Sequence, residues 1–239
     1  MVVVFVIGFA FLGVGSGGLD LQSLVQSVFG AKGSSGPSLE TALKNVQLHP
    51  QQAAAYKELA DAYDRQDNTA QTIAALQQYV RLAPKDISQL QRLGGLELAA
   101  ATTAQQALQL AFFRQQTDGG NTPFSVSPTS TSPLSTLVGP GQITQAVAAQ
   151  DSTALNNANT AYETSAKRAI QVFRQLSKVS PTSTNLIQLA NVAEQLGDAK
   201  TALTAYQSAL GLKDVDPATK REIESRIATL EKAQQNSGG

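Results

Sequence analysis

The chain has 239 residues, with 18 Lys and Arg against 18 Asp and Glu, one His and no Cys. A net charge of zero leaves no basic footprint for nucleic acid and no polybasic membrane patch. The lack of Cys excludes disulfides, thiolate metal sites and Cys nucleophiles, and the single His49 excludes a His-rich metal site within one chain. We therefore expect no nucleic-acid partner and no metal.

Residues 1–15 form an apolar run without charge, followed by Ser16, Gly17 and Gly18. Such a run reaches only about 22 Å across a hydrocarbon core of about 30 Å. It also lacks the basic start and the cleavage site of a signal peptide. Three interpretations remain open: a retained membrane helix over 1–18, which we prefer, a cleaved signal, and a helix buried against a partner subunit. Something must cover this run, because water would not.

Residues 19–37 are predicted to be an amphipathic segment followed by a flexible linker. Asp20 can cap a short helix, and its apolar stripe recurs at helical spacing. The stripe comprises Leu21, Leu24, Val25, Val28 and Phe29. Its polar face has no Lys or Arg, which favours packing on protein over lying on lipid. Gly and Ser then predominate up to Gly36.

An internal repeat follows the linker. Pro50 and Pro84 are 34 residues apart and close similar phrases. The same spacing separates further pairs: Tyr56 and Leu90, Leu59 and Leu93, Ala60 and Gly94. This period resembles the tetratricopeptide repeat (TPR) family, whose members stack antiparallel helix pairs. The resemblance implies an all-α, irregular TPR-like solenoid, with Asp67 or Asn68 in the turn and Thr72 where the family has a small residue.

A second match lies near the C-terminus. A first helix is expected from Leu186, Leu189, Ala190 and Ala193, a turn at Gly197 and Asp198, and a second helix from Ala202, Tyr206 and Ala209. The resemblance implies TPR-like helices over 38–116 and 142–217. The apolar spacing of Ile223, Ile227 and Leu230 predicts a capping helix over 218–235.

Two stretches depart from the family pattern. The unit starting at Leu90 has no Gly-Asp turn, and only a capping box at Thr102 or Thr103 could separate two helices there. Its Leu108, Ala111 and Phe112 are expected to continue the core stripe. Residues 155–176 fit one helix of about seven turns. We therefore predict one long helix, or two nearly continuous ones, where the family has a hairpin.

Residues 117–141 contain four prolines and many Ser and Thr, which excludes one continuous helix. Two interpretations remain open for this loop insertion: a mobile insertion, or an arm that binds a partner. The second depends on its apolar residues, which are Phe124, Val126, Leu134, Leu137 and Val138.

No motif indicates catalysis. His49 precedes Pro50 at an expected helix end and is interpreted as a capping residue. The Gly-rich stretch at 13–18 has no following Lys and is no phosphate loop. Asp61 and Asp64 are interpreted as charge partners of nearby basic residues on one helix. We expect no enzyme, no cofactor and no catalytic residue.

The TPR resemblance also implies a concave groove, lined by the first helix of each unit, for a peptide or a subunit. By register its protein-binding residues would be Lys57, Asp61, Asp64, Arg65, Gln91, Leu98, Ile187, Asn191, Glu194 and Gln195. Family members that clamp a terminal carboxylate need cations and amides there. Asp61 stands in place of an amide and the second unit has no cation at its groove positions, so a chaperone-tail receptor is not expected.

These patterns predict a non-enzymatic, membrane-tethered protein that mediates protein–protein interaction or complex assembly. It is similar to membrane-anchored bacterial TPR proteins. Two alternatives remain: a permanent structural subunit of a larger membrane complex, and a secreted TPR protein with a cleaved signal. No Lys or Arg cluster follows the apolar run, so we expect the bulk of the chain outside the cytoplasm.

Overall fold

The computed structural model describes residues 36–118 and 142–237. The predicted apolar helix, nearly all of the amphipathic segment and linker, and most of the Pro-rich insertion lie outside these ranges. The described residues form helices without any strand, which confirms the all-α class. The helices are α2 (Leu39–Leu48), α3 (Ala53–Asp64), α4 (Thr69–Leu82), α5 (Ile87–Asp118), α7 (Gln142–Val179), α8 (Ser183–Gln195), α9 (Ala199–Leu210) and α10 (Pro217–Ser237).

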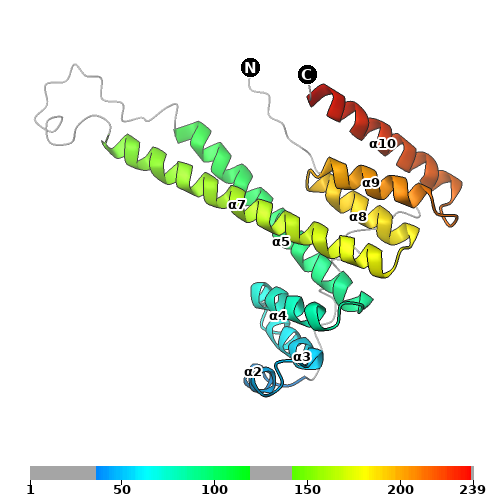
Figure 1. Ribbon diagram of the computed structural model, residues 1–239. Helices are drawn as coiled ribbons and strands as arrows, with labels where there is room; N and C mark the ends of the chain where they lie inside the picture. Colours follow the sequence, from blue (N-terminus) through cyan, green and yellow to red (C-terminus); the bar gives the residue numbers. More distant parts are fainter. Residues whose placement is uncertain (1–35, 119–141, 238–239) are drawn as a thin grey trace, which may run out of the picture.

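Each helix packs mainly on its neighbours in the chain, from α2 on α3 through to α9 on α10. The long helices α5 and α7 make the largest of these contacts and run through the middle of the molecule (Figure 1). Helices α2 to α4 lie on one side of this pair and α8 to α10 on the other. Because packing is with chain neighbours, each hairpin buries its apolar face only by stacking on the next.

The hairpins α3–α4 and α8–α9 have the same turn. Asp67 and Gly197, which are 130 residues apart, both adopt positive φ, at 55° and 82°. The next residue caps the second helix in both cases: the side chain of Asn68 accepts from Gln71 N, and that of Asp198 accepts from Thr201 N. The predicted turns are therefore observed. A left-handed residue followed by a side-chain cap reverses the chain within a few residues.

Small residues allow the two helices of each hairpin to approach. Ala60 and Ala190 on the first helices have no exposed surface, and neither do Thr72 and Ala202 on the second. Thr72 fits where the family has a smaller residue because its hydroxyl donates to the Asn68 carbonyl oxygen at 3.0 Å. The hydroxyl is thus buried with a partner, which removes most of the cost of burying it.

The central helices are continuous. Helix α5 has 32 residues and α7 has 38, so residues 155–176 belong to one helix as predicted. The capping box at Thr102 and Thr103 is not formed. Their hydroxyls instead donate to the carbonyl oxygens of Leu98 and Ala99, one turn earlier in the same helix. Without a Gly or Pro at this point the helix has no reason to end. It continues to Asp118, two residues into the predicted loop.

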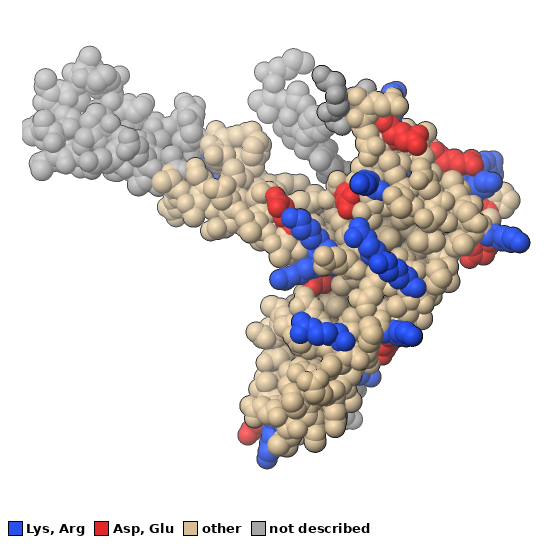
Figure 2. All heavy atoms as spheres, in the orientation of Figure 1, with Lys and Arg blue, Asp and Glu red and all other residues tan. Residues whose placement is uncertain are grey.

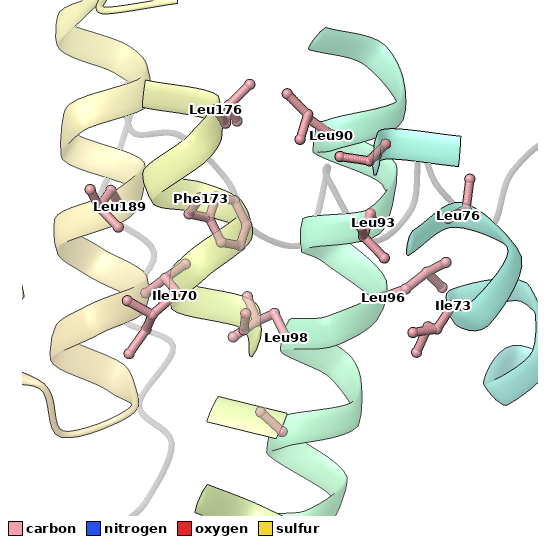
Figure 3. Close-up of a cluster of buried hydrophobic side chains, with 14 of the residues drawn as sticks. Ile73, Leu76, Leu90, Leu93, Leu96, Leu98, Ile170, Phe173, Leu176 and Leu189 are labelled. Atoms are coloured by element: carbon pink, nitrogen blue, oxygen red, sulfur yellow. The ribbon is translucent and has the colours of Figure 1, made fainter. Parts of the chain in front are cut away.

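Apolar residues of α5 and α7 join the two outer groups of helices into one core (Figure 3). Leu90 and Leu93 of α5 face Phe173 of α7, while Leu96 faces α4 on the other side. Gly94 permits this close packing, because a Cβ there would lie 3.0 Å from Cζ of Phe173, which is 1% exposed.

Helix α10 covers the last hairpin in the region predicted for a capping helix. Ile223 is buried, and Ile227 and Leu230 pack against the core. Among residues 36–118 and 142–237 there is no helix with the length and apolar character needed to cross a membrane. The apolar run at 1–15 is not part of that search.

Candidate protein-binding surface

The ten predicted groove residues lie on α3, α5 and α8, the first helices of their units, except Arg65, which follows α3 as its C-cap. On α3, Asp61 and Asp64 are half-buried and bound by Arg92 of α5. The guanidinium donates to Asp61 Oδ1 at 2.5 Å and to Asp64 Oδ2 at 3.0 Å. Two carboxylates one turn apart thus share one arginine fork. The predicted pairing of these Asp residues with bases on their own helix is not what the structure has.

The remaining charged groove residues of this unit are exposed. Lys57 projects from α3 toward solvent. Arg65 donates through Nη2 to the Pro37 carbonyl oxygen at 2.5 Å, and so holds the start of the described chain against the end of α3. Lys57 is therefore the predicted cation of this unit whose charge meets solvent.

On α5 the predicted positions differ in accessibility. Gln91 is half-buried, but Leu98 is 7% exposed and belongs to the core between α5 and α7. The packing of a long second helix, α7, covers the face that a groove ligand would otherwise reach. Leu98 is thus occupied by contacts within the chain.

On α8, Asn191 and Glu194 face the ring of Tyr206 from α9. The Tyr206 hydroxyl donates toward Asn191 Oδ1 at 2.6 Å and Glu194 Oε2 at 2.9 Å. Burial, and then the negative charge of Glu194, raise the pKa of Tyr206 well above its usual value. The second oxygen of Glu194 accepts from Arg226 of α10 at 3.1 Å. Ile187 and Gln195, also on α8, are half-buried.

The two acid–arginine contacts are related by the repeat. Asp64 and Glu194 are 130 residues apart, the same separation as the two turns. Each is bound by an arginine of the second helix further along, Arg92 or Arg226. These pairs join one unit to the next. The acidic groove positions therefore serve stacking, and the positions left for a ligand are Lys57, Gln91, Ile187 and Gln195.

Sequence reasoning missed both arginines. It took Gln91 as the groove residue and found no cation in the second unit, although Arg92 is the next residue. A signal was present: each arginine lies about 30 residues after an acidic residue on the same face of the repeat. The choice of one position over its neighbour depends on helix rotation, which the 34-residue period does not define.

One further carboxyl is buried outside the predicted surface. Glu97 of α5 is 2% exposed, and Gln77 of α4 donates to its Oε1 at 2.6 Å. Burial raises its pKa, against the opposing effects of Gln77 and the charge of Arg168 on α7. The acid fastens α4 to α5 and is closed to solvent, so it offers no binding function.

No described residues form a cluster of three or more His, Asp or Glu side chains that could hold a metal ion. Comparison with known proteins adds no relative: no family model matches the chain, and no curated protein matches it. The candidate surface therefore depends on the geometry of α3, α5 and α8 alone.

Proposed function

We propose that the chain is a non-enzymatic, membrane-tethered TPR-like protein that holds other proteins in an assembly. The observation that carries the proposal is the repeated hairpin: α3–α4 and α8–α9 share a positive-φ turn, a capped second helix and buried small residues 130 residues apart. Stacked units of this kind present extended surfaces rather than enclosed reaction sites.

The partner would bind along the first helices of the units. Lys57, Gln91, Ile187 and Gln195 supply one cation, two amides and one apolar side chain with partial or full exposure. This mixture suits a polar peptide or helix with an apolar anchor. It lacks the row of cations that binds a free carboxylate.

Photo-crosslinking in the native membrane tests this surface. A photoreactive amino acid at Gln91 or Gln195 should capture one partner protein from the intact full-length chain. The matched controls are Gln71 and Gln207, which are exposed on the second helices α4 and α9. Equal capture from all four positions would contradict a partner surface on the first helices.

The tether and its orientation need a separate test. Residues 1–18 would anchor the chain, with the helical units outside the cytoplasm. The chain has no Cys, so Gln207→Cys gives a single exposed thiol. A maleimide that does not cross membranes should label it in intact cells and the protein should stay with the membrane fraction. Labelling only after lysis would contradict the orientation.

A further inference from the structure

The end of α5 exposes large apolar side chains to water. We call residues Leu110 to Phe113 the arm tip, because they lie near the far end of the α5–α7 pair. Leu110 is 61% exposed, Phe112 53% and Phe113 63%, while Ala111 between them is 8% exposed and faces α7. Phe112 was expected in the core, and its exposure corrects that expectation.

The arm tip is apolar on all sides. Consecutive residues of an α-helix are separated by about 100°, so four in succession cover most of the circumference. Helix α7 covers the side of Ala111, and the other three side chains point into the remaining directions. A helix that is apolar all round is normally enclosed by protein or by lipid. A partner that docked on one face would leave part of this tip in water.

The apolar surface is confined to the tip. One and two turns earlier the outer face of α5 carries Gln106 and Thr103, both exposed. A helix that paired lengthwise with a second copy of the chain would continue its apolar stripe along those turns. The distribution therefore favours entry of the end of the arm into an apolar medium.

The arm also lacks charge. Between Leu98 and the tip α5 has no charged residue, and the described side chains of α7 opposite, from Ala149 to Tyr162, include only Asp151. Figure 2 shows this projecting part almost entirely without Lys, Arg, Asp or Glu, in contrast to the body of the molecule. Nothing here would oppose burial in a neutral lipid surface, and nothing selects anionic lipid.

We propose that the arm tip inserts into the boundary between headgroups and acyl chains of a bilayer. Chain length permits this alongside a tether at residues 1–18. Residues 19–37 can extend to at most about 60 Å, and the 32 residues of α5 measure about 48 Å. The contact is separate from the proposed function, because it needs neither the partner surface nor the tether as its anchor.

Single tryptophans test the insertion, since the natural chain has none. Leu110→Trp and Phe112→Trp place the reporter on nearly opposite sides of the tip. Leu48→Trp is the matched control, because Leu48 is an apolar residue of α2 that is 64% exposed. The full chain is reconstituted into phosphatidylcholine vesicles, with or without brominated acyl chains. We expect blue-shifted, strongly quenched emission from both tip variants, at a depth of about 5–10 Å, and neither effect from the control.

Three results would overturn the inference. Unquenched emission from the tip variants, while the protein floats with the vesicles, would leave the tether intact and remove the arm from the bilayer. Quenching of only one tip variant would indicate docking on one face. A blue shift that grows with protein concentration without vesicles would assign the tip to a second copy. Conversely, quenching of both variants without crosslinks from Gln91 or Gln195 would support the arm and contradict the partner surface.

Discussion

The two short hairpins have the same backbone and different fastenings. In both, a residue at positive φ ends the first helix and a side chain caps the second. In α3–α4 the position facing the first helix is Leu76, and Arg92 holds the acids from outside the hairpin. In α8–α9 the equivalent position is Tyr206, whose hydroxyl meets the acid directly. Repeat geometry thus depends on turn, cap and small residue, and leaves the polar contacts free to vary.

The junctions after the hairpins extend this comparison. Asp86 and Asp216, again 130 residues apart, precede α5 and α10 and accept backbone N–H groups of the first turn. Asp86 also accepts from the Tyr79 hydroxyl at 2.6 Å. Position 209 in the other hairpin is an alanine and makes no such bond. The N-terminal hairpin is therefore fastened at its junction and the C-terminal one at its centre.

The largest expected effect comes from the central position. Tyr206→Ala should lower the free energy of unfolding by about 3–5 kcal/mol, and Leu76→Ala by about 2–5 kcal/mol. Tyr206→Ala also strips a donor from Asn191 and Glu194, so we expect it to be the more costly. Urea unfolding of the full chain measures both. A smaller loss for Tyr206→Ala would mean that its ring, and not its hydroxyl, is poorly used.

The small residues should be equally sensitive in both hairpins. Ala190→Trp should destabilise by about 1–3 kcal/mol through overpacking, and Ala60→Trp by a similar amount, since both side chains are fully buried. Thermal unfolding followed by circular dichroism would compare them. If either substitution is neutral, the equivalence of the two positions is wrong.

The arginines should differ. The Arg92 side chain is 16% exposed and bonds two carboxylates, so Arg92→Ala should cost about 1.5 kcal/mol. The Arg226 side chain is 50% exposed and bonds one, so Arg226→Ala should cost about 0–1 kcal/mol. Double-mutant cycles with Asp64→Asn and Glu194→Gln isolate each pair. Equal coupling energies would remove the distinction between the hairpins.

The turn residues isolate a backbone effect. Gly197→Ala should cost about 1 kcal/mol because the new residue must hold positive φ. No heavy atom lies within 4 Å of the added Cβ, so packing does not contribute. Gly197→Asn is the control and should cost less, since Asn, like the Asp67 of the other turn, tolerates this conformation. A full loss with Asn as well would point to a steric cause.

The smallest effect concerns pH. The hydrogen bond from Tyr79 is the main cause that lowers the pKa of Asp86 below 3.8, and the same bond raises the pKa of Tyr79 to about 12. A lowered folded-state pKa adds stability that is present above the unfolded value and lost as pH falls through the folded value. Tyr79→Phe should therefore destabilise at pH 6, and the difference should shrink as pH falls below 3.8. Unfolding at a series of pH values measures it, and a constant difference would contradict the linkage.

Much of the architecture could be predicted from local patterns. The turn at Gly197 and Asp198 follows from their conformational and capping preferences. The continuity of α7 follows from its apolar spacing without an internal breaker. Phe112 illustrates the failure: its spacing places it near the core stripe, but α7 covers a narrower face of α5 than the stripe would allow, so the ring stays exposed.

The sequence by itself determined that nothing in this chain offers Cys or multiple-His chemistry, that its helices come in repeated hairpins, and that its charge is balanced. These follow from composition and from short-range preferences. Only the tertiary structure decided which acids are bound by Arg92 and Arg226, that Leu98 and Glu97 are buried, and where the uncharged apolar arm tip emerges. Those outcomes depend on the rotation and crossing of long helices, and a change of one residue in register exchanges a buried side chain for an exposed one.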